Sequence, residues 1–262
     1  MRAGLGGMLR SEWTKIRTVR STLWSIVSMV AIATGLMMVI AWAIIGRWDR
    51  LEPADRAELA NDPVSLILGQ PILVAQLVVA VLGVMVVSAE YTTGMIRSTL
   101  QAQPRRLTVL AAKILVFAAL MLAVGEALSF AVFFIGRRLI ASRIPLDLDD
   151  PGVLRSVVGA GLYLAVLGLF SLAAGAILRH TAGAITGVLG LMLVLSNLTG
   201  LLPDSWGHHV NAWMPTNAGQ LVYQPSLEPG HLLTQWQGFA VFTGWTALFL
   251  AIAAVLFVKR DA

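Results

Sequence analysis

Residues 63–89 decide the fold, and they read PVSLILGQPILVAQLVVAVLGVMVVSA. These 27 residues carry no charge and are bounded by Asp62 and Glu90. An α-helix rises about 1.5 Å per residue, so about 20 mostly apolar residues cross the hydrocarbon core of a bilayer. The stretch therefore predicts a transmembrane helix.

Five more stretches of the chain have the same character. Together they give six predicted spans, over residues 22–45, 63–89, 114–136, 156–178, 182–202 and 239–258. Composition agrees, since 13% of the chain is charged against about 25% in soluble domains. The first stretch is too long for a signal-peptide core, which has about 7–15 residues. We therefore expect an all-α polytopic membrane protein with six transmembrane helices.

Lys and Arg residues in the connections predict the orientation. Twelve of them fall on the side of the N-terminus and seven on the other side, where ten of the acidic residues also lie. Because cytoplasmic loops carry the excess of Lys and Arg, both termini are expected in the cytoplasm, with the chain in the inner (plasma) membrane. Arg137, Arg138 and Arg143 go against this trend. The net charge of +5 comes from residues that are distributed unevenly between the two sides of the membrane. It therefore indicates the lipid bilayer as a partner, and we expect no binding to nucleic acid.

The whole chain, residues 1–262, is predicted to form one transmembrane domain. It comprises an amphipathic helix over residues 1–21, a six-helix bundle over 22–258 and a cytoplasmic tail over 259–262. The chain has no cysteine, no G-x-x-x-x-G-K-[ST] pattern for phosphate binding, and neither H-E-x-x-H nor G-x-S-x-G. We therefore expect a chain that is not an enzyme and that binds no cofactor or metal.

The N-terminal residues predict an amphipathic helix in the membrane interface. One helical face carries Leu5, Met8, Leu9, Trp13, Ile16 and Val19, and the other carries Arg10, Thr14, Lys15, Arg17 and Thr18. Glu12 falls within the apolar face, which leaves two interpretations. One is a local ion pair with Lys15 at i,i+3. The other is a contact to a basic group on the bundle or on a partner.

The connection after residues 63–89 carries the most specific pattern, and residues 90–106 read EYTTGMIRSTLQAQPRR. Gly94 permits a turn, residues 95–103 are predicted to form a short helix, and Pro104 suits the first turn of the next helix. The short helix has an apolar stripe of Met95, Ile96, Thr99 and Leu100. Such a stripe is typical of a helix that inserts into a groove on a soluble partner. The alternative is an ordinary loop whose basic residues touch anionic lipid.

The pattern E-Y-x-x-G-x-[IL]-R-x-x-L in residues 90–100, followed by Pro104, basic residues and Lys113, resembles the permeases of ATP-binding-cassette transporters of the type-2 (exporter) class. The opening residues 11–22, SEWTKIRTVRST, also look like the start of many actinobacterial members. The six spans and the long connection between the fifth and the sixth agree. The resemblance therefore covers nearly the whole chain.

This resemblance implies roles for particular residues. The N-terminal helix, with Glu12, Trp13, Lys15 and Arg17, would be the connecting helix. A coupling helix would dock on a separate ATPase subunit through Glu90, Tyr91, Gly94, Met95, Arg97, Leu100, Gln103, Arg105 and Arg106. Two permease chains would pair as a homodimer or heterodimer, and ATP and Mg²⁺ would bind to the partner ATPase subunits. Residues 203–238 would hold short outer re-entrant helices.

Glu126 interrupts the third predicted span. A carboxylate at mid-membrane depth is costly and usually faces the bundle or water. It is either a contact for substrate or protons along the pathway, or a neutral acid hydrogen-bonded to Ser129 or to a facing backbone. The alternative to an exporter permease is an ion-coupled secondary transporter or channel. Ion coupling would be favoured by a chain of buried acids or arginines, and only Glu126 is present.

Small residues and histidines mark the later part of the chain. Pairs at four-residue spacing are Ser171 and Gly175, Gly183 and Gly187, and Ser196 and Gly200. They predict close helix packing inside one bundle, with a seam between two chains as the alternative. His208 and His209 are adjacent and so point in different directions, which argues against a metal site. The aromatic residues around them predict an interfacial lid.

Overall fold

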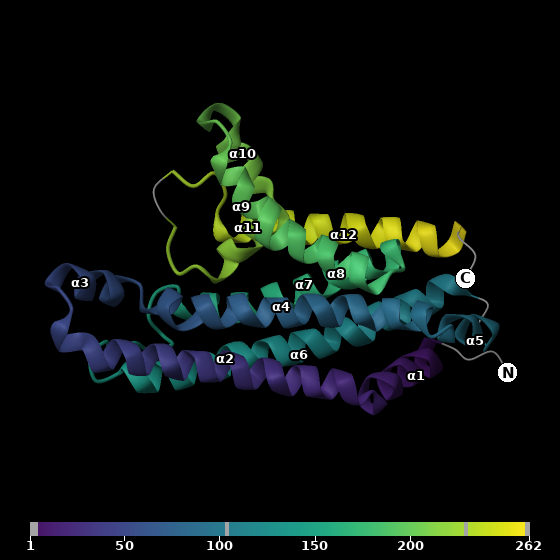
Figure 1. The fold of residues 1–262 in the computed structure, drawn as a ribbon, viewed down its shortest axis with the longest axis horizontal. Coiled ribbons are helices and arrows are strands. Elements are labelled where there is room, and N and C mark those ends of the chain that lie inside the picture. The colour runs from purple at the N-terminus through teal and green to yellow at the C-terminus, as the bar shows by residue number, and fades with distance from the viewer. Residues whose placement is uncertain (1–4, 103–104, 228–229, 260–262) are drawn as a thin grey trace.

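The computed structural model describes residues 5–102, 105–227 and 230–259. Within these ranges the chain is helical and has no strand. Six helices are long and apolar enough to cross a membrane. The prediction of an all-α polytopic membrane protein is therefore confirmed. Figure 1 shows long helices running roughly along one axis, with the fifth span oblique to them.

The spans agree with the predicted ones in number and place. They are α2 (Arg20–Arg47), α4 (Pro63–Thr92), α6 (Arg106–Ile140), α7 (Val153–Leu178), the fifth span (Thr181–Leu201) and α12 (Gln235–Lys259). The fifth span joins α8 (Thr181–Leu189), the π-helical turn η2 (Gly190–Leu195), α9 (Ser196–Leu198) and η3 (Thr199–Leu201). Helix α6 begins eight residues before the predicted span, because backbone hydrogen bonds continue past charged side chains.

Shorter helices lie at the ends of the bundle and beside it. They are α1 (Leu5–Thr18), η1 (Trp48–Arg50), α3 (Pro53–Asn61), α5 (Met95–Ala102), α10 (Asp204–Trp213), α11 (Pro215–Gln220) and η4 (Leu221–Tyr223). Helices α1 and α5 share one end with the C-terminal part of α12, here called the α1 end (Figure 1). Helix α3 lies at the opposite end, the α3 end. The short helices expected in residues 203–238 are present as α10, α11 and η4.

Helix α7 is the centre of the bundle. It packs against α4, α6 and α12. In its most apolar stretch of 18 residues, 78% of the residues are buried, whereas the corresponding share in α12 is 22%. An added Cβ at Gly83 of α4 would lie 2.4 Å from the carbonyl oxygen of Gly168, and one at Gly175 would lie 2.8 Å from that of Val84. Since only glycine permits such approach, these residues bring the backbones of α4 and α7 together.

Two of the three small-residue pairs lie in different surroundings. Ser171 and Gly175 face α4 inside the bundle, as predicted. Gly183 and Gly187 are exposed on α8. The hairpin between the fourth and fifth spans is as tight as predicted, because Arg179 takes a left-handed conformation with φ 55° and ends α7.

Two of the three arginines that go against the charge asymmetry have acidic partners at the α3 end. Arg137 Nη2 lies 3.0 Å from Asp147 Oδ2, and Arg143 Nη2 lies 2.9 Å from Asp49 Oδ2. Both pairs are partly exposed. The charges of Arg137 and Arg143 are therefore locally neutralised.

Candidate functional site: an ion-pair cluster at the α1 end

Four charged side chains from three helices meet at the α1 end. Glu12 and Lys15 come from α1, Glu90 from the last turn of α4, and Lys113 from the first part of α6. Lys15 Nζ donates to Glu12 Oε1 at 2.7 Å and to Glu90 Oε1 at 2.8 Å. Lys113 Nζ donates to Glu12 Oε2 at 2.7 Å and to Glu90 Oε1 at 2.9 Å. We call these four residues the ion-pair cluster.

The cluster is largely buried, and its formal charges cancel. Glu12, Glu90 and Lys113 are at most 6% exposed, and Lys15 is half-buried. Burial lowers the pKa of Lys15, but its hydrogen bonds to Glu12 and Glu90 and their charges outweigh this and raise the pKa overall. A buried charge carries a large desolvation penalty unless it is paired. The cluster therefore holds α1, α4 and α6 in one arrangement, because a slipped helix would leave a buried charge unpaired.

The two interpretations of Glu12 on the apolar face of α1 can be compared with its contacts. One carboxylate oxygen pairs with Lys15 in its own helix, and the other pairs with Lys113 of α6. The local pair and the contact to a basic group on the bundle are therefore both present. The sequence pattern did not single out Lys113 as a site residue. Its signal is a lysine inside an apolar helix, where burial requires an acidic partner.

Helix α1 contacts the bundle through a narrower stripe than predicted. Met8 packs against Val109 and Ala112 of α6. Trp13 is 44% exposed, and Arg17 is exposed as well. The predicted apolar face is therefore divided, with one edge against α6 and the edge carrying Trp13 open to the surroundings.

Helix α5 follows α4 after a turn of two residues. Gly94 has φ +70°, which confirms the predicted turn, because residues with a Cβ rarely adopt this left-handed conformation. Thr99 Oγ1 of α5 accepts a hydrogen bond from Lys15 Nζ at 3.5 Å. The ion-pair cluster thus contacts α5 as well as the three helices that form it.

The apolar stripe predicted on α5 is only partly available to a partner. Ile96 is buried against Leu110 of α6 and Phe257 of α12, so its assignment to a free docking stripe is wrong. Met95 is 47% exposed, and Arg105 after α5 is exposed too. The side chains of Arg97 and Leu100, and the whole of Gln103, lie outside the described residues.

Two arginines at the same end bind the last carbonyl groups of α12. Arg106 Nη1 donates to the carbonyl oxygens of residues 257–258 at 3.3 and 3.2 Å. Arg179 Nη2 donates to the carbonyl oxygen of Leu256 at 3.3 Å. The guanidinium of Arg179 lies 4.8 Å from the centre of the Tyr91 ring. The last carbonyls of a helix lack intrahelical partners, and cations are favourable there. Tyr91 and Arg106 therefore connect α4 and α6 to the end of α12.

Glu126 lies in α6, about 20 Å along the helix from Lys113. Its carboxyl group covers Gly161 of α7, where an added Cβ would approach Glu126 Cδ to 2.5 Å. Ser129 Oγ donates to the main-chain carbonyl of Glu126 at 3.0 Å. The Ser129 hydroxyl therefore donates within its own helix, and the role of the Glu126 carboxyl group stays a prediction.

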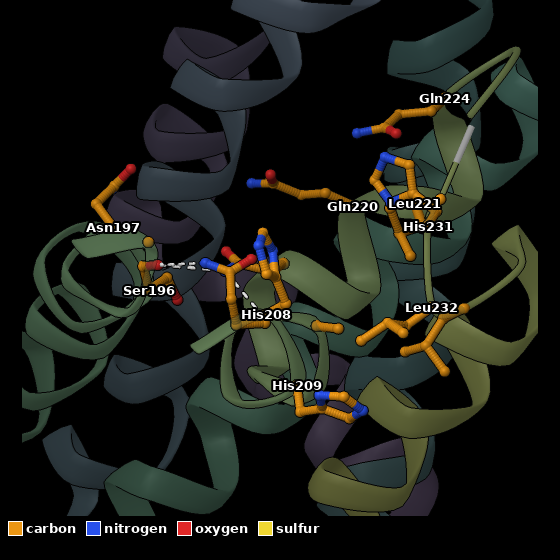
Figure 2. A pocket seen from close by; sticks show the side chains of 15 residues that line it. Ser196, Asn197, His208, His209, Gln220, Leu221, Gln224, His231 and Leu232 are labelled. Atoms are coloured by element: carbon orange, nitrogen blue, oxygen red, sulfur yellow. Dashed lines mark hydrogen bonds between the residues drawn. The ribbon is translucent and has the colours of Figure 1, made fainter. Parts of the chain in front are cut away.

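A separate cavity of about 830 Å³ lies between the fifth span, α10, α11 and the loop before α12. Figure 2 shows Gln220, Gln224 and His231 on one side of it, Asn197 on the other, and His208 between them. None of its described lining residues is Asp, Glu, Lys or Arg. Within the described ranges, no group of three or more His, Asp or Glu lies close enough to hold a metal ion. We call this space the polar cavity.

A buried hydrogen-bond network lies beside the polar cavity. Tyr163 OH of α7 donates to Gln76 Oε1 of α4 at 2.6 Å, and Gln220 Nε2 lies 3.5 Å from the same oxygen. Gln76 is 1% exposed and precedes Glu90 by about 21 Å along α4. A single helix, α4, therefore contacts both the ion-pair cluster and a residue that lines the polar cavity. The sequence signal for Gln76 is an amide inside an uncharged run.

Comparison with known proteins adds no family to this description. No family model matches the chain, and no curated protein matches it.

Proposed function

We propose that the chain is the membrane-spanning permease subunit of an ATP-binding-cassette exporter. Two such chains would enclose the translocation path, and separate ATPase subunits would bind at the α1 end, on the cytoplasmic side. The observation that carries the proposal is the ion-pair cluster. It fastens α1 and α6 to the last turn of α4, immediately before the turn into α5.

Movement of α5 by an ATPase subunit would pass to the membrane helices over short distances. Only Thr93 and Gly94 separate α5 from α4. Ile96 packs against α6 and α12, and Thr99 binds Lys15 of α1. A shift of α5 would therefore move α1, α4 and α6 together. Because α4 also carries Gln76, the same shift would reach the polar cavity and support alternating access.

Co-purification with an ABC ATPase subunit tests this proposal. The double variant Met95→Asp, Arg105→Glu changes two exposed side chains around α5 and replaces none of the four residues of the ion-pair cluster. An acidic residue at the start of a helix is favourable, so α5 should stay folded. We expect at least about tenfold weaker ATPase binding, or about 1.4 kcal/mol, with unchanged monodispersity of the permease.

Arg50→Glu with Ala54→Asp is the matched control, because both side chains are exposed at the α3 end. This variant should bind the ATPase as the wild type does. Equal binding by both double variants would contradict docking at α5. Substrate movement by the purified chain without any ATPase would instead favour an ion-coupled transporter, for which Glu126 over Gly161 is the supporting observation.

A further inference from the structure

A second cavity, of about 470 Å³, lies beside the ion-pair cluster where α1 meets α2 and α4. Val19 joins α1 to α2 in an extended conformation, with φ −77° and ψ 101°, so the two helices do not continue in one line. Apolar side chains of α1 and α4, among them Ile16, Leu82 and Met85, line the walls. Helix α2 contributes the small polar residues Ser21, Thr22 and Ser25. The ion-pair cluster forms its charged end. We call this space the amphipathic cavity.

The amphipathic cavity contains a buried polar atom that the described chain leaves unsatisfied. Glu90 lines the cavity and is 6% exposed. Its Oε1 accepts from Lys15 and Lys113, whereas its Oε2 has no hydrogen-bond partner among the described residues. Native proteins rarely leave a buried acceptor without a donor, because the lost hydration is not recovered. A donor on an occupant of the cavity would complete the site.

The walls and this oxygen together define the chemistry of the occupant. Its body must be apolar to cover the walls, and its head must donate a hydrogen bond to Glu90 Oε2. The two lysines and two glutamates cancel in formal charge, so the unsatisfied acceptor Glu90 Oε2, rather than a net charge, selects the head, and an anionic head has no donor to offer it. An ammonium head fits best, since charged donors form the stronger hydrogen bonds with carboxylates. The volume lies within the range of about 300–1,000 Å³ that is usual for small-molecule sites.

We propose that the amphipathic cavity binds an amphiphile with a primary ammonium head and an apolar body. Lipids with an ethanolamine head and cationic amphiphiles dissolved in the membrane share this chemistry. An occupant would contact α1, α2 and α4 at once and would stabilise the ion-pair cluster. Binding requires only this chain, so the proposal stands or falls independently of an ATPase partner.

The test compares two amphiphiles on the purified full chain in phosphatidylcholine nanodiscs. Dodecylamine and dodecyltrimethylammonium have the same alkyl chain and the same charge at neutral pH, but only dodecylamine has N–H donors. Native mass spectrometry measures bound amphiphile during titration. We expect dodecylamine to bind at least about tenfold more tightly, because it alone donates to Glu90 Oε2. Equal affinities would overturn the proposal.

Two tryptophan variants locate the binding. Ser25→Trp fills the cavity from α2 without altering the ion-pair cluster, whereas Ser28→Trp, one turn later, lies on an exposed face. We expect Ser25→Trp to weaken dodecylamine binding at least about tenfold and Ser28→Trp to leave it unchanged. Ser25→Leu should act in the same direction with a smaller effect. Wild-type affinity in Ser25→Trp would show that dodecylamine partitions into lipid, and the site would be rejected.

A second lipid mixture separates the two sources of the occupant. In nanodiscs that contain phosphatidylethanolamine, a lower apparent affinity for dodecylamine would show that the lipid occupies the site. An unchanged affinity would assign the site to cationic amphiphiles. Both results support the site only if the preference for dodecylamine over dodecyltrimethylammonium persists, and loss of that preference would count against it.

Discussion

Among single residues, Lys113 joins two buried carboxylates that come from different helices. Its ammonium group is the donor to Glu12 Oε2 and shares Glu90 Oε1 with Lys15. Lys113→Met keeps an unbranched apolar chain but removes the charge. Breaking a buried ion pair costs about 3–5 kcal/mol, so we expect the free energy of unfolding to fall by about that amount. Denaturant titration of the purified chain in detergent measures the change.

Arg137→Met is the control for this prediction. Arg137 pairs with Asp147 at 3.0 Å, but the two side chains are 35% and 59% exposed. Exposed ion pairs contribute about 0–1 kcal/mol, so the control should lose little stability. If both variants lost the same amount, burial of the ion-pair cluster would not be the source of its strength.

At the scale of elements, the turn between α4 and α5 determines where α5 lies. Gly94 has φ +70°, and an added Cβ there would meet no atom within 4 Å. The effect of Gly94→Ala is therefore conformational, and the left-handed region costs residues with a Cβ about 1–2 kcal/mol. We expect α5 to open more often, with about tenfold faster amide hydrogen exchange in residues 95–102.

Gly35→Ala provides the comparison for the turn. Gly35 lies within helix α2, and an added Cβ there would also meet no atom within 4 Å. Because alanine favours the helix over glycine, no loss of stability is expected. Unchanged exchange of α5 in Gly94→Ala would show that α5 is held by Ile96 and Thr99 rather than by the turn.

At the scale of the whole molecule, the bundle depends on close contact between α4 and α7. An added Cβ at Gly83 would lie 2.4 Å from the carbonyl oxygen of Gly168 and 2.7 Å from Ser171 Cβ. Gly83→Ala would therefore push apart the two most buried spans. Overpacking costs about 1–3 kcal/mol. We therefore expect the free energy of unfolding to fall by this amount and the midpoint of thermal unfolding to be lower.

Gly244→Ala in α12 is the control for helix packing, since nothing lies within 4 Å of its added Cβ. Its thermal midpoint should match that of the wild type. A wild-type midpoint in Gly83→Ala would mean that α4 and α7 separate without cost, which would contradict a bundle centred on α7.

The amino-acid sequence by itself determined the class of the protein and most of its local structure. The six spans follow from the lengths of apolar runs, because each helix satisfies its own backbone hydrogen bonds in lipid. The turn at Gly94 follows from the conformational freedom of glycine. The short hairpin at residues 179–180 follows from the two apolar runs that leave only these two residues between them. The pairing of Glu12 with Lys15 follows from helical spacing alone. None of these depends on which helices become neighbours.

Only the tertiary structure decided which groups meet across the bundle. Lys113 is 101 residues from Glu12, and Gln76 is 87 residues from Tyr163. Helical periodicity cannot show that α1 turns Met8 and Glu12 toward α6, or that Ile96 of α5 faces its own bundle. The physical reason is that desolvation and ion pairing depend on distances set by packing, and the same charged residue is costly or stabilising according to its neighbours.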